Sequence, residues 1–280
     1  DARREGIAGY VCAMPWIIGF LCFTAGPILA SILLSVTEYD VLHPAKFVGF
    51  RNYADLLTRD PVFWKSLGNT AFMVVGVPLG MAVGLGLAML LNTEVKGIAV
   101  YRTIFYLPAI VPVVASSVLW IWVLNPESGL LNSALRFVGL EPLLTKLAIA
   151  IGADGLFWLQ EERLAKPAII VMGLWSAGSS MIIWLAGLKG IPTHLYEAAE
   201  IDGAGRVSRF RHITLPMLSP YIFFNLIMGV IGTFQIFTQA YIMTQGGPVD
   251  ATLFYVYYLF NSAFQYFRMG YASAMAWILF

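Results

Sequence analysis

The sequence is poor in charge and has no cluster of basic residues. Charged residues make up 12% of the 280 residues, whereas soluble domains carry about 25%. So few charges cannot cover a water-exposed surface of this size, which excludes an ordinary soluble protein. The formal net charge is +1, and no basic run is present that could neutralise phosphates. A nucleic-acid partner is therefore not expected.

Cysteine and histidine are also scarce. Cys12 and Cys22 lie in one apolar run, where we interpret them as small helix residues rather than as a disulfide or metal site. His43, His194 and His212 are scattered and lack metal-ligand spacing. The chain has no G-x-x-x-x-G-K-[ST] phosphate loop and no nucleophile–base–acid set in its polar segments. We therefore expect no catalytic residue, and any energetic work would be driven by a partner.

Long apolar runs are what the sequence has in abundance. Hydrophobic residues make up 59% of the chain, and its mean hydropathy is +0.76. A membrane helix needs about 20 apolar residues. Runs of this kind cover residues 7–36, 67–91, 104–124, 168–188 and 221–244. The first is too long for a simple signal peptide and lacks its cleavage pattern. The sequence predicts an all-α integral membrane protein with one transmembrane domain over residues 1–280.

The last 30 residues allow two interpretations. Residues 252–267 are apolar but include Asn261 and Gln265, Arg268 interrupts them, and residues 270–280 are apolar again. Eleven residues at about 1.5 Å each cannot cross a bilayer. We favour a sixth span that begins near Gly270 and within which the given chain ends. The alternative is one long span from about Ala251.

The distribution of basic residues predicts the orientation. Lys and Arg are enriched in short cytoplasmic segments. With the N-terminus inside, the short inner segments contain Arg3, Arg4, Lys96, Arg102, Lys189, Arg206, Arg209 and Arg211. Residues 38–65 and 125–167 then form long outer loops, and residues 143–151 and 157–159 can form short helices at the membrane rim. We expect a cytoplasmic N-terminus and a cytoplasmic loop at residues 189–216. Trp120, Trp122, Trp158 and Trp175 fall near the outer boundaries, as in an aromatic belt.

Small residues and prolines mark two of the spans. Gly76, Gly80 and Gly84 recur every four residues, which lets another helix approach closely. This contact could be a moving or subunit interface, or static packing within the chain. Pro108 and Pro112 should kink the third span because each removes a backbone donor.

The spans carry neutral polar residues rather than buried charges. No acid, Arg or Lys interrupts the five runs above, whereas ion-driven carriers usually need intramembrane carboxylates. Thr233, Gln235 and Gln239 share the fifth run with Phe237 and Tyr241. Hydrogen-bonding groups interleaved with aromatic rings suit an uncharged, hydroxylated solute. Hydrogen bonding between helices is the alternative interpretation.

The most polar segment between two spans is predicted to form a short helix. Thr193 can serve as its N-cap, and Ala198 and Ala199 keep one face slim enough to enter a cleft of another protein. Glu197, Glu200 and Asp202 flank this face and can meet basic groups. Gly203 and Gly205 would end the helix. It can be a docking helix or an ordinary surface helix.

This segment resembles the EAA loop of ABC importer permeases. The resemblance rests on LYEAAEIDGA at residues 195–204, followed by Ile213, Leu215 and Pro216. FVGFRNY at 47–53 and RTIFYLP at 102–108 resemble segments of the carbohydrate branch of that family. GGP at 246–248 and GYASA at 270–274 resemble its maltose- or glycerol-phosphate-type first permease. The resemblance covers nearly the whole chain and implies the type I importer architecture with about six spans.

The resemblance implies both partners and site residues. The expected partners are a second permease, a pair of ATPase subunits that hold ATP and Mg²⁺, an external solute-binding protein and the lipid bilayer. The residues that would couple to the ATPase are Glu197, Ala198, Ala199, Asp202 and Gly203. Those expected near the solute pathway are Ser176, Ser180, Gly229, Gly232, Thr233 and Ile236, to which the polar pattern adds Gln235 and Gln239. Several differ from the maltose pattern, because Gly or Ile stands where amides are expected.

The resulting hypothesis is a permease subunit of a bacterial importer for a sugar or oligosaccharide, located in the inner membrane and working by alternating access. A glycerol-3-phosphate or phosphodiester importer is the rival within the class, and it predicts a basic or helix-N-terminal anion site. An ion-coupled carrier and a membrane enzyme are less favoured, because the spans lack carboxylates and the chain lacks a catalytic cluster.

Overall fold

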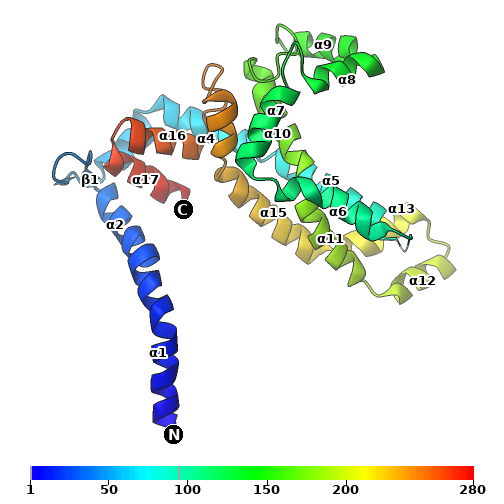
Figure 1. The fold of residues 1–280 in the computed structure, drawn as a ribbon, viewed down its shortest axis with the longest axis horizontal. Coiled ribbons are helices and arrows are strands. Elements are labelled where there is room, and N and C mark those ends of the chain that lie inside the picture. The colour runs from blue at the N-terminus through cyan, green and yellow to red at the C-terminus, as the bar shows by residue number, and fades with distance from the viewer. Residues whose placement is uncertain (1, 94) are drawn as a thin grey trace. The chain divides into compact units, whose positions relative to one another are not determined.

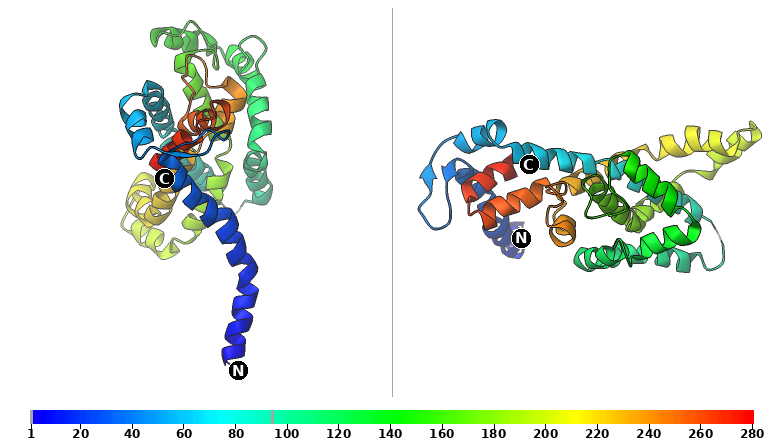
Figure 2. Two further views of the ribbon diagram at one scale, coloured as in Figure 1. Left: turned by 90° about the vertical axis from the view of Figure 1, so that its left-hand side faces the viewer. Right: turned by 90° about the horizontal axis from the view of Figure 1, so that it is seen from above.

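The computed structural model describes residues 2–93 and 95–280, without the side chains of residues 2–4, 7 and 8. The side chains of Arg3 and Arg4, which contributed to the predicted orientation, thus lie outside the described part. The chain forms two compact units, which are described separately (Figures 1 and 2). Unit 1 comprises Asp1–Trp64 and Tyr258–Phe280, and unit 2 comprises Lys65–Tyr257.

Unit 1 begins with a long apolar helix. Helices α1 (Ala2–Phe20) and α2 (Gly26–Ser35) are joined by a π-helical turn (Leu21–Ala25), and residues 9–35 are long and apolar enough to cross a membrane. No residue in the most apolar window of this helix is buried, as expected for a helix that faces lipid. The first predicted span is therefore helical through Ser35.

The rest of unit 1 packs around the end of α2. A two-residue antiparallel pair, β1 (Thr37–Glu38) with β2 (Lys46–Phe47), precedes α3 (Arg51–Thr58). Helix α16 (Tyr255–Phe260), which begins in unit 2, continues into a π-helical turn (Asn261–Gln265), and α17 (Met269–Leu279) packs on α2 and α3. The break at residues 266–268 agrees with a new helix near Gly270 rather than one long span. Gly270 is required there, because a Cβ would lie 2.0 Å from the Thr37 carbonyl oxygen.

Unit 2 contains the bent spans. Its helices, in order, are α4 (Pro61–Met73, beginning in unit 1), α5 (Gly76–Leu91), α6 (Ile98–Ile110), α7 (Val113–Val123), α8 (Leu130–Val138), α9 (Glu141–Ala150), α10 (Glu162–Trp175), α11 (Gly178–Lys189), α12 (Thr193–Ile201), α13 (Arg206–Arg209), α14 (Leu215–Met217) and α15 (Ser219–Phe234). π-Helical turns follow at Phe210–Thr214 and Ala240–Thr244.

Among the described residues, two helices are long and apolar enough to cross a membrane, α1–α2 and α4–α5. If each of three bent helix pairs forms one span, the number of candidate spans is five. Helices α6 and α7 meet at 95°, α10 and α11 at 51°, and residues 206–217 meet α15 at 66°. Helix α17 is apolar but shorter. The all-α membrane fold is confirmed, and the expected kink near Pro108 and Pro112 is present.

Two predicted spans need correction. The span predicted at 168–188 begins at Glu162 and breaks at Ser176–Ala177, so Lys166 lies inside a span helix. The span predicted at 221–244 leaves the α-helix after Phe234. Near that end, the Thr233 hydroxyl donates to the Gly229 carbonyl at 2.8 Å, a local bond of the kind that bends helices.

The α5–α11 contact organises the core of unit 2. Ala88 and Leu91 of α5 pack against Met181 and Trp184 of α11. A Cβ on Gly84 would lie 2.2 Å from the Ser180 hydroxyl oxygen, and one on Gly76 would lie 3.3 Å from Ile170. The small-residue face of α5 therefore serves packing within the chain. The Arg102 guanidinium donates to the Leu91 carbonyl at 2.7 Å and satisfies the last turn of α5.

The α10–α11 bend brings Gly178 against the backbone of α6. A Cβ at this position would lie 2.1 Å from the Phe105 carbonyl oxygen. Gly178→Ala should therefore lower the apparent Tm of the purified protein in detergent by several degrees, since overpacking costs about 1–3 kcal/mol. Gly86→Ala is the matched control, because Gly86 is exposed and has no atom within 4 Å of its Cβ position. An unchanged Tm for Gly178→Ala would contradict this close approach.

Candidate functional site

A cavity of about 790 Å³ lies among α5, α6, α7, α10, α11 and α15 of unit 2. Apolar side chains form most of its wall. Polar groups enter from Ser116 of α7, from the α10–α11 break, and from Asn225 and Thr233 of α15. None of the residues that line it is charged. The cavity therefore suits a neutral solute, because an ion would lose its hydration without gaining a partner.

Most of the predicted pathway residues meet at this cavity. Its lining includes Ser176, Ser180, Gly229, Gly232, Thr233, Ile236 and Gln239. Gln235 does not line it and is exposed at the end of α15. That the residues lining the cavity contact the transported solute stays a prediction.

The cavity also contains residues that sequence reasoning left out of the predicted pathway. Asn225, Ser116 and Ser179 were recognisable only as neutral polar residues within spans. Trp175 was assigned to the aromatic belt, but it lines the cavity, 37% exposed, with its ring edge-on to Trp120. The helix break directly after Trp175 turns it toward the cavity, and no sequence signal marked that break.

The hydroxyl groups of the polar wall offer hydrogen-bond acceptors. The Ser176 and Ser180 hydroxyls donate to carbonyl oxygens of their own segment at 2.9 Å, and the Thr233 hydroxyl does so at 2.8 Å. The Asn225 amide likewise donates to the Tyr221 carbonyl at 2.8 Å. Because the hydroxyl protons are committed, the hydroxyl lone pairs remain for a solute, together with the Asn225 carbonyl oxygen and its second amide N–H. A solute rich in hydroxyl donors complements such a wall.

Lys166 lies one helical turn beyond the cavity residues Ile169 and Ile170. Its ammonium group donates to the Asn69 side-chain oxygen at 3.0 Å and lies 5.1 Å from the Phe72 ring centroid. The Asn69 amide in turn donates to the Asp250 and Leu253 carbonyls. Helix α10 begins six residues before the predicted span, so Lys166 belongs to the same helix but lies outside the apolar run 168–188. Lys166 nevertheless does not line the cavity.

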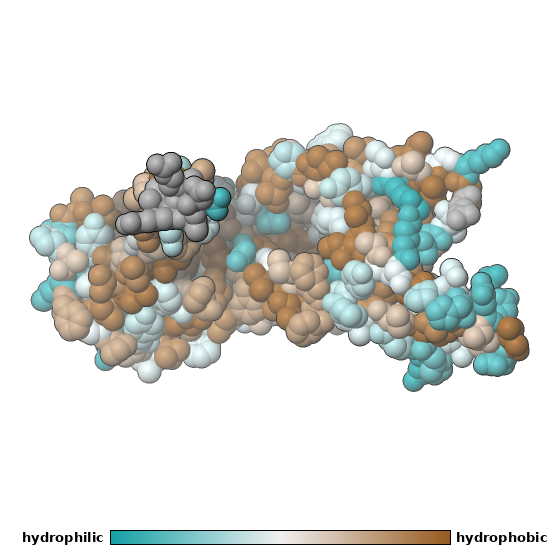
Figure 3. All heavy atoms as spheres, turned by 90° about the horizontal axis from the view of Figure 1, so that it is seen from below, coloured by the Kyte–Doolittle hydropathy of each residue, from teal (hydrophilic) through white to brown (hydrophobic). Residues whose placement is uncertain are grey.

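Helix α12 is a second candidate site, and with α13 it projects from the end of unit 2 (Figure 2). Hydrophilic side chains gather at this end, on the right of Figure 3. Leu195 and Tyr196 pack against the α5–α11 core, and the Tyr196 hydroxyl bonds to the Thr214 hydroxyl at 2.9 Å. One face of α12 is thus anchored to the spans on both sides of the loop.

The other face of α12 is available to a partner. Glu197, Ala198 and Asp202 are exposed, and Ile201 is 87% exposed. Ala199 is half-buried. An apolar side chain this exposed, surrounded by carboxylates, forms a surface that a basic and partly apolar cleft could cover.

The ends of α12 differ in part from the prediction. Thr193 is the first helical residue and Pro192 occupies the N-cap position, because Pro192 adopts an extended conformation with ψ 130°. Gly203 has φ +77°, which favours glycine, whereas Gly205 has φ −67°, which any residue can adopt. Gly203 alone therefore provides the left-handed turn that ends the helix.

These features agree with the family that the sequence resembles. The family described as "Binding-protein-dependent transport system inner membrane component" matches residues 76–280. This chain belongs to that family. It is a multi-pass membrane protein and a permease component of ABC transporters.

Named relatives cover almost the whole chain. The probable ABC transporter permease protein YesP of Bacillus subtilis (strain 168) is 45% identical over 281 residues, which is 99% of this chain and 87% of the relative. The lactose transport system permease protein LacF of Rhizobium radiobacter is 35% identical over 99% of this chain and 90% of its own. These relatives confirm the predicted resemblance to carbohydrate-branch permeases.

A solved structure shows the same fold. The permease chain is from a bacterial ABC transporter involved in the import of the acidic polysaccharide alginate, and it aligns with a TM-score of 0.79. The alignment covers 99% of this chain and 91% of that one at 24% identity. The predicted importer architecture is thereby confirmed. No group of three or more His, Cys, Asp or Glu in the described part could hold a metal ion.

Unit 1 contains a carboxylate that joins three segments. Asp60 accepts hydrogen bonds from the backbone N–H groups of Val62 and Phe63 at the start of α4, and from the hydroxyls of Tyr258 and Tyr271. Partial burial raises the pKa of this carboxyl group, but these four hydrogen bonds outweigh burial and lower its pKa overall.

The lowered pKa of Asp60 predicts a pH dependence of stability. A carboxyl group with a lowered pKa in the folded state stabilises the fold above its unfolded pKa of about 3.9, and this stabilisation is lost as pH falls through the folded pKa. The apparent Tm difference between wild type and Asp60→Asn should therefore be largest near pH 6 and shrink toward pH 3. Asp154→Asn, at an exposed loop position, is the control. A difference that stays constant with pH would refute this role.

Proposed function

We propose that this chain is a transmembrane subunit of an ATP-driven, binding-protein-dependent importer of a sugar or oligosaccharide. The uncharged, acceptor-rich cavity of unit 2 is the observation that carries this proposal. Saccharide hydroxyl groups would donate to the lone pairs of Ser176, Ser180 and Thr233, while Trp175 offers an apolar face to the ring carbons. The names of LacF and of the trehalose/maltose permease MalF of Thermococcus litoralis support a sugar as the solute.

The transport cycle would be driven from outside this chain. ATP and Mg²⁺ would bind to separate ATPase subunits, and a second permease would complete the pathway. Helix α12 would enter a cleft of the ATPase with Glu197, Ala198, Ala199, Asp202 and Gly203, on the cytoplasmic side that also holds the N-terminus. Because Tyr196 ties α12 to the following span, ATPase closure would move α12 and the spans together. Only tighter ATP binding to one state can shift the populations.

The rival solute classes fit the cavity less well. A glycerol-3-phosphate importer would place a cation or a helix N-terminus at the phosphate. The start of α11 lines the cavity, but no charged residue does, and Lys166 is bound to Asn69. An ion-coupled carrier would need a carboxylate in the same place, and none lines it.

Thr233 and Gln235 provide a matched test of the cavity. We expect Thr233→Leu to raise the KM for sugar uptake into proteoliposomes about tenfold, because losing one hydrogen bond costs about 1–1.5 kcal/mol. Gln235→Leu lies outside the cavity lining and should leave KM unchanged. The assay uses the complete transporter with the candidate sugars lactose, maltose and trehalose. Equal kinetics for wild type and Thr233→Leu across all of them would exclude Thr233 from the pathway.

Substitutions at α12 test the coupling role. Glu197→Lys should weaken ATPase association in detergent about tenfold or more, because a like-charge contact at an interface costs several kcal/mol. Gly203→Val should do the same, since φ +77° strains a branched residue. Gly205→Val is the control, with an ordinary φ and open space around its Cβ. If the ATPase co-purifies fully and drives uptake in both variants, α12 does not dock it.

A further inference from the structure

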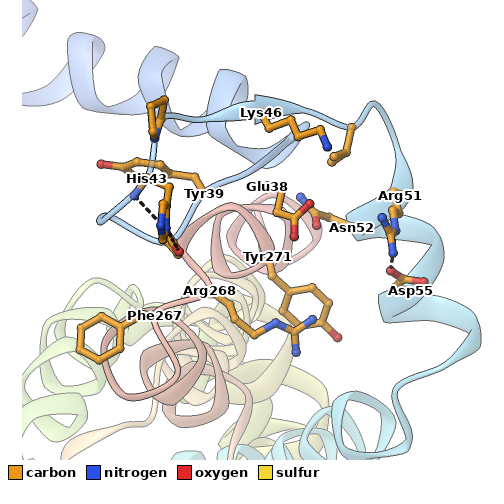
Figure 4. Close-up of a pocket in the computed structure, with 13 residues that line it drawn as sticks. Glu38, Tyr39, His43, Lys46, Arg51, Asn52, Asp55, Phe267, Arg268 and Tyr271 are labelled. Atoms are coloured by element: carbon orange, nitrogen blue, oxygen red, sulfur yellow. Dashed lines mark hydrogen bonds and ion pairs between the residues drawn. The ribbon is translucent and has the colours of Figure 1, made fainter.

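Unit 1 contains a second pocket, of about 460 Å³ and separate from the cavity of unit 2 (Figure 4). Three segments form it: the β1–β2 connection, helix α3, and the start of α17. Its lining is rich in charged and aromatic side chains, including Glu38, Lys46, Arg51, Arg268 and Tyr271. No residue that lines the cavity of unit 2, and no residue of α12, belongs to this pocket. Its chemistry therefore calls for a different ligand.

Most charges in this pocket already have partners. Asp40 lies 2.7 Å from the His43 ring nitrogen, and this hydrogen bond is the main cause of the lowered pKa of Asp40. Asp55 pairs with Arg59 at 3.0 Å and with Arg51 at 3.7 Å. Asp40, Asp55 and Arg51 are therefore already engaged in contacts within the protein.

Two cations remain without an acidic partner in the described part of the chain. Neither Lys46 nor Arg268 has a carboxylate oxygen within ion-pair distance. Glu38 is paired with Lys46 in the β1–β2 register, but their side chains form no ion pair. The unpaired groups of the pocket thus comprise two cations and one carboxylate, which favours an anionic ligand.

Arg268 is held in place before any ligand arrives. Its guanidinium carbon lies 4.1 Å from the Tyr271 ring centroid, and the Tyr271 hydroxyl donates to Asp60 (Figure 4 shows the Arg268–Tyr271 contact). The Arg268 backbone N–H donates to the Ser262 carbonyl at 2.8 Å. Phe267, just before it, has φ +53°, a strained conformation for an aromatic residue. A guanidinium stacked on an anchored ring loses little entropy when it binds a carboxylate with two hydrogen bonds.

Exposed apolar side chains adjoin the pocket. Leu42 is 81% exposed, Phe47 75% and Phe50 77%, and each is a chain neighbour of a lining residue. Phe267, which lines the pocket, is 53% exposed. Large apolar residues beside an ordered arginine and tyrosine are typical of protein–protein contacts, where these residue types contribute most of the binding energy. A free ion or a small solute would not need these exposed apolar side chains around its binding site.

We propose that this pocket docks the external solute-binding protein, with Arg268 binding an Asp or Glu side chain of that protein through two hydrogen bonds. Lys46 adds attraction for the same carboxylate, and the neighbouring apolar residues cover it. Charge complementarity points to an acidic group, and the family description itself names a binding protein. The proposal rests on the proposed importer function and on the outward location of residues 38–65.

The test uses the complete transporter in lipid nanodiscs and its cognate binding protein, produced separately. Arg268→Gln should raise the Kd for the binding protein about ten- to a hundredfold and abolish most of the salt dependence of binding. Arg136→Gln is the control, because Arg136 is exposed and pairs with Glu141, and neither residue lines the pocket. Its Kd should stay within about twofold of wild type.

A second pair of variants separates docking from loss of folding. Tyr271→Phe keeps the ring but loses its hydrogen bond to Asp60, so the Kd should rise less than in Arg268→Gln. Replacing the partner carboxylate of the binding protein by Arg should restore binding to Arg268→Glu. Basal ATP hydrolysis and Tm should match wild type in Arg268→Gln. If the wild-type transporter hydrolyses no ATP, that result counts against the proposed importer function and not against the docking pocket.

Two results would overturn the docking proposal. One is that Arg268→Gln, with the same Tm as wild type, binds the binding protein with an unchanged Kd and an unchanged salt dependence. The other is a shift in Tm when glucuronate is added without binding protein, seen in wild type but not in Arg268→Gln. That result would assign the pocket to a carboxylated sugar instead of a protein side chain.

Discussion

The need to satisfy every backbone hydrogen bond inside lipid is the constraint on which the rest of this structure depends. It requires helices in the spans, and it allows irregular backbone only where protein or a water-filled cavity replaces the missing partners. The helix breaks of unit 2 obey this rule. Val111 between α6 and α7, Ser176 and Ala177 between α10 and α11, and Ile236 after α15 all line the cavity. These three breaks and the cavity are therefore one feature, whereas the bend before α15 is packed in protein around the buried Leu218.

The same constraint determines the chemistry of the cavity. A serine or threonine in a membrane helix commonly donates its proton to a carbonyl of its own helix, as Ser180 and Thr233 do. The wall that results accepts hydrogen bonds but carries no charge. Selectivity for hydroxylated solutes would thus follow from how small polar residues are tolerated in lipid. Lys166, a cation in the first turns of α10, is bound by Asn69 beyond the cavity lining.

The two surfaces proposed to meet other proteins both carry charged side chains. Helix α12 presents Glu197 and Asp202 beside the exposed Ile201, and its other face is anchored to the spans through Tyr196. The pocket of unit 1 presents Arg268 on an anchored tyrosine. Both surfaces combine a rigid support with an unmatched charge and exposed apolar side chains. Both proposed contacts, with the ATPase and with the binding protein, therefore use charge on a rigid support.

The sequence by itself determined the membrane class, the approximate positions of the spans, the kink at Pro108 and Pro112, and the family through its EAA-type segment. These follow from local signals, since apolar length, proline and motif spacing act over a few residues. Tertiary structure alone decided the α10–α11 break, the exclusion of Gln235 from the cavity, the inclusion of Trp175, and the anchored Arg268. Each depends on contacts between segments distant in sequence, such as Gly178 against Phe105 or Tyr271 with Asp60, which no local pattern encodes.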